Sequence, residues 1–460
     1  MRALWRFAMV GILLMLVPLV SADPLGELKD FFSTLPKSDL ADEDEDEETA
    51  VTENFDLQID LRTWRRGGQT FAQLPALQRY LNRVAMRVLA NKADARRPVQ
   101  VIIAPSAAFG AYTLPNGGIF VNLGTILALR SEDEVAALLG HEIAHLLLRH
   151  HDSDEYRNLL DKGFKVAELY MASRGQQFGK RDFQKLQAAS WVSQKALFPA
   201  WSRKQEDAAD RKGVDLLVAA GYNADAMVRL LKIVARATER QQKELQALPP
   251  KQAVERMIRE MERKVSAEHA SAVARQKGIR AYLKKRHANR QRPAFLRQPW
   301  QAALREPRTA SAIARYRRGH RVERLLTTGS NAATARDLRA LLVETDVRDA
   351  YLQMLAFRIA LMQKDGARAM TALRQAHASG TAPFLTYRIL AELAVRKQDY
   401  VQADRYLKEL NTLFDYPPQT LPLTISVNRR LKRFLLPLQM RCVATADKAL
   451  IQRCNEAATR

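Results

Sequence analysis

The residues best suited to chemistry are two histidines and a glutamate in the run His-Glu-Ile-Ala-His at positions 141–145. On a helix, residues four apart lie about 40° apart around the axis, so the imidazoles of His141 and His145 face one point on the same side. Such a pair can hold a zinc ion, and Glu142 can then reach a metal-bound water as general base. The flanking residues are apolar almost all round, which predicts a buried helix on which unpaired polar groups would be costly. We therefore favour a metal site over a pair of histidines on a helix surface.

Two histidines leave a catalytic zinc site short of one protein ligand, because the fourth position is kept for water. Glu206 is the candidate, and Asp210 follows it four residues later on the same face of a predicted helix. We expect Glu206 to bind the metal and Asp210 to hydrogen-bond a ligand histidine, which fixes its tautomer. Asp207 has a suitable side chain but points about 100° away. The sequence thus predicts one Zn²⁺ per chain, held by His141, His145 and Glu206.

Local patterns predict the elements that position these residues. The run Ser-Glu-Asp-Glu at 131–134 has the capping-box pattern and predicts the start of a helix that continues to His150. Apolar residues at helical spacing predict a helix within 71–89. Short apolar runs around a Pro-Asn-Gly-Gly turn predict strands at 99–103, 111–114 and 119–123. The predicted fold class is mainly α: an α+β zincin-like catalytic domain with a small sheet over residues 55–238, followed by a tetratricopeptide-like (TPR-like) α-solenoid.

The N-terminal 54 residues predict export followed by a linker. Residues 1–22 have a basic start, an apolar run and small residues at the end, as in a secretory signal peptide; an uncleaved membrane anchor is the alternative. The apolar run is shorter than the roughly 20 residues that cross a bilayer comfortably. Residues 23–54 predict an acidic disordered linker, since eight of the ten residues at 39–48 are acids. A calcium site there is disfavoured, because the glycine and closing glutamate of a calcium loop are missing.

The charge of the chain predicts an anionic partner. Its 460 residues carry 73 Lys and Arg against 50 Asp and Glu, a formal net charge of +23. Residues 239–308 predict a basic helical insertion, and only Glu306 and Glu323 are acidic between 271 and 330. This stretch is either a solvated helix face or a surface for anionic lipid or lipopolysaccharide. We expect no nucleic-acid partner, because an exported protein does not meet cellular nucleic acid and no nucleic-acid-binding motif is evident in the sequence.

The C-terminal third predicts helical repeats. Asn331, Asp365 and Asp399 are each 34 residues apart and each is followed four residues later by alanine, which favours TPR-like repeats over residues 309–415. An irregular helical bundle is the alternative. Residues 416–460 predict a C-terminal helical cap. The chain's two cysteines, Cys442 and Cys454, lie in this cap and form either a disulfide or two buried thiols.

These motifs together resemble the zinc metallopeptidases of the CAAX prenyl protease and HtpX type. The resemblance rests on the 141–145 run followed by Arg149 and His150, on Glu206 with Asp210, and on the glycine-bearing stretch 110–118. It implies that His141, His145 and Glu206 bind zinc, that Glu142 is the catalytic base and that Asp210 is the supporting carboxylate.

The resemblance carries further expectations. It implies that Ile119–Asn122 is an edge strand that pairs with extended substrate, which explains weak sequence selectivity. It gives Arg203 a role in anchoring the second helix, with a plain salt bridge as the alternative. His150 matches a family position too, but it lies five residues beyond His145, on another face of the helix, so we expect it to be structural. The family's His-Pro-x-x-x-x-Arg element is not evident; its nearest equivalent is the stretch 305–308, where Glu306 would replace the histidine.

The predicted function is a periplasmic zinc endopeptidase, a hydrolase, acting on misfolded or stalled envelope proteins. Exported family members with TPR repeats imply unfolded or misassembled outer-membrane proteins as substrates and the outer-membrane assembly machinery as a partner of the repeats. The alternative is an exported chaperone or scaffold with a mainly structural metal site.

Overall fold

The structure is a computed structural model that describes residues 55–90, 98–151, 201–246, 272–290, 292–328, 349–363 and 365–459. The signal peptide and acidic linker predicted for residues 1–54 lie outside these ranges, as does Asn331 of the first predicted repeat. The described residues are mostly helical with one small sheet, which confirms the mainly α fold class.

The sheet has three strands, β1 (Gln100–Ala104), β2 (Ala111–Thr113) and β3 (Gly118–Asn122). Their order is β1-β3-β2, with β1 parallel and β2 antiparallel to β3. The three predicted strands are therefore confirmed, but the prediction that Ile119–Asn122 is an edge strand is wrong. β3 is the central strand and is fully buried. β2 is the strand at one edge of the sheet. β1 lies at the opposite edge, where the side chain of Asn82 pairs with its backbone. The Nδ2 atom of Asn82 donates a hydrogen bond to the carbonyl of Val101, and its Oδ1 accepts one from the N–H of Val101.

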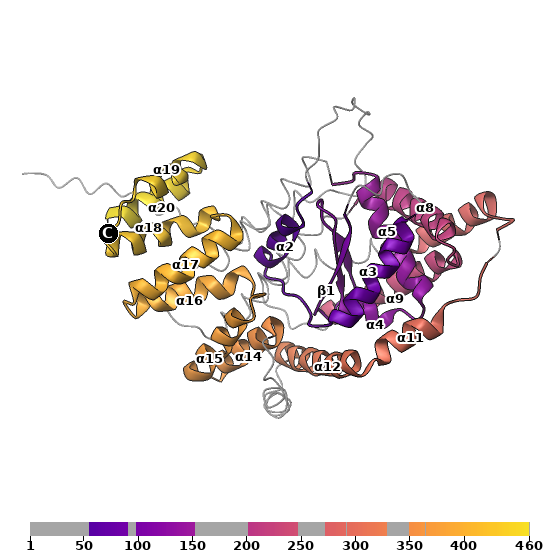
Figure 1. Cartoon of the computed structure of the whole chain (residues 1–460), viewed down its shortest axis with the longest axis horizontal. Helices are drawn as coiled ribbons and strands as arrows, with labels where there is room; N and C mark the ends of the chain where they lie inside the picture. Colours follow the sequence, from indigo (N-terminus) through magenta and orange to yellow (C-terminus); the bar gives the residue numbers. More distant parts are fainter. Residues whose placement is uncertain are drawn as a thin grey trace, which may run out of the picture.

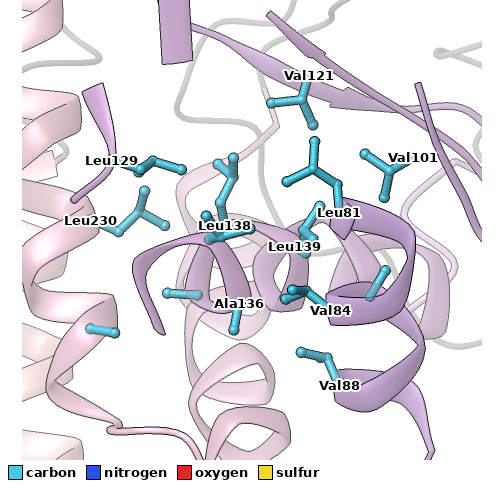
Figure 2. Close-up of a cluster of buried hydrophobic side chains, with 14 of the residues drawn as sticks. Leu81, Val84, Val88, Val101, Val121, Leu129, Ala136, Leu138, Leu139 and Leu230 are labelled. Carbon is cyan, nitrogen blue, oxygen red and sulfur yellow. The ribbon is translucent and has the colours of Figure 1, made fainter. Parts of the chain in front are cut away.

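The helices near the sheet cover both of its faces. They are α2 (Leu57–Arg66), α3 (Pro75–Leu89), α4 (Leu123–Ala128), α5 (Glu132–Leu147), α8 (Arg203–Ala219) and α9 (Asp225–Gln246). Alternate strand residues face opposite sides, so Val101 and Val121 join the core built with α3 and α5 (Figure 2). On the other side, Phe120 stacks on Trp64 of α2 with ring centroids 4.2 Å apart.

The start of α5 follows from its sequence. Ser131 precedes the helix and its hydroxyl accepts a hydrogen bond from the N–H of Glu134 at 3.2 Å, as the capping pattern predicts. The side chains of Asp133 to Leu146 are all buried. The helix that carries residues 141–145 therefore runs through the centre of the domain (Figure 1).

Two glycines let α5 and α8 cross closely. A Cβ atom at Gly213 would lie 2.8 Å from Cε of Met227 and 3.2 Å from the backbone nitrogen of His141. One at Gly140 would lie 3.4 Å from the carbonyl oxygen of Gly213. The backbones thus approach at the residue next to the first predicted ligand, which brings the N-terminal half of α8 alongside both histidines.

Part of the segment predicted as a basic insertion belongs to this core. Residues 272–286 form a helix, followed by α11 (Arg297–Arg305) and α12 (Pro307–Thr328). Ile279, Leu283 and Trp300 join the same buried cluster as α3, α5 and α8. The described part of 239–308 is thus packed on the peptidase-like domain. Its described Lys and Arg side chains are exposed, with the exception of Arg275.

The C-terminal helices form antiparallel pairs beside the domain (Figure 1). They are α14 (Ala350–Met362), α15 (Gly366–Ala378), α16 (Phe384–Arg396), α17 (Tyr400–Phe414), the short η1 (Pro418–Thr420), α18 (Leu421–Arg430), α19 (Leu436–Ala444) and α20 (Lys448–Thr459). Asp365 and Asp399 each cap the second helix of a pair through a side-chain oxygen, in agreement with the 34-residue spacing.

Contacts at each end of the C-terminal helices tie them in place. The guanidinium of Arg65 on α2 donates two hydrogen bonds, at 2.9 and 2.7 Å, to the carbonyl of Ala382 before α16. Cys442 on α19 and Cys454 on α20 lie together in a buried cluster.

Within the described residues, no helix combines the length and apolar character needed to cross a membrane.

The glycine crossing generates a prediction. Gly213→Ala should lower the free energy of unfolding by about 1–3 kcal/mol, because its Cβ has no room between the helices. Gly278→Ala is the control: a Cβ there meets nothing within 4 Å, and alanine should raise stability by about 0.5–1 kcal/mol in a helix. Urea unfolding followed by circular dichroism measures both, and a Gly213→Ala protein as stable as wild type would contradict the close crossing.

Candidate active site

The structure brings the three predicted ligands together at the crossing of α5 and α8. The Nε2 atoms of His141 and His145 are 3.2 Å apart. Carboxylate oxygens of Glu206 lie 3.5 Å from His141 Nε2 and 3.8 Å from His145 Nε2. One ligand atom from each of the three residues lies within 4.8 Å of the other two.

These separations fit a single small metal ion. Two imidazole nitrogens that share a tetrahedral zinc at about 2.0–2.1 Å lie about 3.3 Å from each other, close to the observed 3.2 Å. Two nitrogens and one carboxylate oxygen are a donor set that zinc accepts.

Asp210 supports His141 from behind. Its Oδ1 lies 2.9 Å from Nδ1 of His141, within ion-pair distance. Burial disfavours a charge on Asp210, but Arg275 and His141 outweigh it and lower its pKa to about 2. The ionised carboxylate can therefore hold a proton on Nδ1 of His141 and leave Nε2 free to bind a metal.

His145 is supported by His150. Their Nδ1 atoms are 2.8 Å apart, and the ring of Trp201 stacks on His145 with centroids 5.0 Å apart. Burial and nearby His141 lower the pKa of His150 to about 4, so it is neutral near pH 7. Because Nε2 of His145 faces the ligand cluster, we assign the shared proton to Nδ1 of His145 and the acceptor to His150. His150, predicted to be structural and on another face, thus contacts a predicted ligand.

The predicted base, Glu142, is buried and held by the edge strand. The hydroxyl of Thr113 on β2 donates to Oε2 of Glu142 at 2.7 Å. Burial raises the pKa of Glu142, while His141 and the bond from Thr113 oppose the rise. A buried carboxyl whose pKa is moved toward neutrality is suited to accept and return a proton.

Arg275, which the sequence analysis did not single out, bridges the carboxylates of α8. Its Nε and Nη2 atoms donate to Asp210 at 2.7 Å each, and its Nη1 contacts Glu206. Although burial opposes its charge, Glu206 and Asp210 raise the pKa of Arg275. A signal for it exists: Arg275 follows His269 by six residues, the spacing of the His-Pro-x-x-x-x-Arg element, with Ala270 in place of proline.

Two other residues predicted near the site have different roles. Arg203 is 62% exposed and lies 4.0 Å from Asp207, so it makes a weak surface ion pair. Glu306, assigned to the position of the family histidine, caps α12 by accepting from Arg308 and Thr309. The element predicted at 305–308 was therefore misplaced.

The bridge made by Arg275 generates a prediction for the metal-free protein. Arg275→Met should lower the free energy of unfolding by about 3–5 kcal/mol at pH 7, because the carboxylate of Asp210 stays buried without its cation. Arg203→Met, the exposed control, should change it by about 0–1 kcal/mol.

The pH dependence of this effect has a defined sign. Because the pKa of Asp210 is lowered to about 2 from an ordinary 3.8, its stabilisation is complete above that ordinary value and is lost as the pH falls toward 2. The difference between wild type and Arg275→Met in urea unfolding should shrink over that range. If Arg275→Met and Arg203→Met lowered the free energy of unfolding equally at pH 7, the proposed bridge would be contradicted.

Comparisons with known proteins agree with this geometry. Residues 75–283 match the model of peptidase family M48, a range that ends within the helix carrying Arg275. The chain is 26% identical over 166 residues to a putative β-barrel assembly-enhancing protease of Vibrio cholerae, covering 35% of this chain and 34% of the relative. A β-barrel assembly-enhancing protease of Escherichia coli O157:H7 is 21% identical over 171 residues, covering 36% and 34%. The mitochondrial metalloendopeptidase OMA1 of Arabidopsis thaliana is 32% identical over 124 residues, covering 27% and 23%.

The match is confined to the part of the chain that carries the site. It spans about a third or less of the length of these curated relatives. Within that part, the family model includes both histidines, Glu206 and Asp210 of α8 and the bridging arginine. Residues 75–283 are therefore similar to the metallopeptidases of family M48, including the β-barrel assembly-enhancing proteases.

Proposed function

We propose that the chain is a zinc-dependent endopeptidase that hydrolyses peptide bonds of misfolded or stalled outer-membrane proteins. The observation that carries the proposal is the convergence of His141, His145 and Glu206 on one point, with the buried carboxyl of Glu142 on the same helix. We assign the first three residues as zinc ligands, Glu142 as the base and Asp210 as the carboxylate that orients His141.

The chemistry divides between the ion and the chain. A zinc ion in this site would polarise a peptide carbonyl and lower the pKa of water. Glu142 takes the proton from the attacking water and passes it to the leaving amine. Asp210 and His150 hold the two imidazoles in orientation, and Arg275 holds Glu206 and Asp210.

Substrate is proposed to pair with β2, not with β3. Gly110 and Leu114 bond to β3, so by alternation the backbone groups of Ala111 and Thr113 face away from β3. Thr113 thus lies at the point where the edge strand meets the base. In the structure its carbonyl accepts a bond from His151 at 2.7 Å, which an extended substrate would replace.

The biological setting is proposed from the named relatives and the sequence. Similarity to β-barrel assembly-enhancing proteases supports envelope proteins as substrates, and residues 1–22 support export to the periplasm. Export would allow the paired Cys442 and Cys454 to form a lasting disulfide. The 34-residue helix pairs support a TPR-like domain that binds substrate or the outer-membrane assembly machinery.

Removing the base tests the proposed activity. Glu142→Gln should keep zinc bound but lower cleavage of an unfolded protein such as casein by at least about 10³-fold, because no carboxylate remains to accept the proton. Glu392→Gln, on α16 and paired with Arg388, is the matched control and should cleave at the wild-type rate.

A metal chelator separates the enzyme from a chaperone with a structural metal. Chelation should abolish cleavage and re-addition of zinc should restore it. Wild-type proteolysis by Glu142→Gln, or suppression of aggregation without any cleavage in the zinc-loaded protein, would contradict the proposal.

The bond from Thr113 generates a separate prediction. Thr113→Val should lower kcat by about 10- to 100-fold with little change in KM, because a hydrogen bond to a charged carboxylate contributes about 1.5–3 kcal/mol. Thr113→Ser keeps the hydroxyl and should retain activity within about threefold, with zinc content equal in all three proteins. A Thr113→Ser protein as impaired as Thr113→Val would show that the methyl group, not the hydroxyl, is needed.

A further inference from the structure

Four large apolar side chains are exposed together at the outer end of the C-terminal helices. Phe434 is 76% exposed, and Leu436, Met440 and Val443 on α19 are 51%, 60% and 56% exposed. The three residues of α19 are four and three positions apart, so they share one face of the helix. Phe434 precedes the helix by two residues. We call these four residues the α19 patch.

The opposite side of α19 is occupied, so this patch faces outward. α19 packs on α18 and α20, and its Leu438 and Cys442 join their buried cluster. Cys442 is paired with Cys454 of α20. The helix lies at the periphery of the molecule (Figure 1). The packing of α19 thus keeps this apolar face exposed to solvent. The face could be buried against the rest of the molecule only if the whole helix rotated.

Cations are frequent in the sequence around the patch. From residue 429 to the last residue, 460, there are eight Lys and Arg and only Asp447 and Glu456 as acids. Arg430, Lys432 and Arg441 are exposed and flank the patch in the sequence. Among the described residues, no carboxylate lies within ion-pair distance of these three side chains, whereas neighbouring Arg433 pairs with Asp404.

An apolar face close in sequence to exposed cations that pair with no carboxylate of the described residues has the chemistry of a surface that rests on anionic lipid. The apolar side chains can enter the acyl boundary while the cations meet the headgroups. A second copy of the chain is a poor occupant, because self-association would bring the cations of both copies together. We propose that the α19 patch and these exposed cations dock on an anionic membrane surface.

Site-specific quenching tests the proposal in the full chain. Met440→Trp should be quenched by brominated lipids in vesicles of phosphatidylcholine with about 30% phosphatidylglycerol, because the side chain enters the acyl boundary. Val401→Trp is the matched control, since Val401 is 58% exposed but lies on α17 outside the patch. Both proteins share the apolar run 7–20, so that run cannot account for a difference between them.

A second experiment measures vesicle binding by a variant that lacks the three cations. Replacing Arg430, Lys432 and Arg441 with Ser should weaken binding to the anionic vesicles by about tenfold or more, since each cation near the surface is attracted to anionic headgroups. Neutral vesicles should bind the wild type more weakly than anionic vesicles do.

Three results would overturn the proposal. The first is equal quenching at positions 440 and 401, or none at 440. The second is equal binding of the wild type to neutral and anionic vesicles. The third is a wild-type dimer in light scattering that Met440→Ser converts to a monomer, which would assign the patch to self-association. Because all the substituted side chains are exposed, circular dichroism should show the wild-type fold in every variant.

Discussion

The close crossing of α5 and α8 is the constraint on which the rest of the site depends. Gly140 and Gly213 leave no Cβ between the two backbones, so the helices approach next to His141. At that separation Glu206, seven residues before Gly213, reaches both imidazoles. The sheet and α3 pack on the other sides of α5 and hold it in place. The large buried core is therefore what fixes the geometry of a small polar site.

Charge balance is the second requirement of this buried site. Glu142, Glu206 and Asp210 bring three carboxyl groups close to two imidazoles, and burial alone would favour the neutral forms of Glu142 and Asp210. Arg275 supplies a cation to the two carboxylates of α8. A divalent ion between the imidazoles and Glu206 would supply the rest. Both the charges of the site and the distances between its ligand atoms thus suit one metal ion.

Local sequence patterns predicted much of this molecule because they reflect local physics. Capping residues and helical periodicity gave the start of α5 and the spacing of His141 and His145 on one face. The strand order was missed, since pairing depends on contacts far apart in the chain, and β3 proved to be central. Arg275 was missed for the same reason: it lies 65 residues after Asp210 and faces it only once the helix at 272–286 packs on the core.

Zinc-edge X-ray absorption on the purified protein, loaded with one equivalent of zinc, tests the central claim most directly. We expect two imidazole nitrogens and carboxylate or water oxygens at about 2.0–2.2 Å, with no sulfur. Glu206→Ala should change the oxygen shell and leave both imidazoles. A site with fewer than two imidazoles, or a spectrum that Glu206→Ala leaves unchanged, would contradict the account.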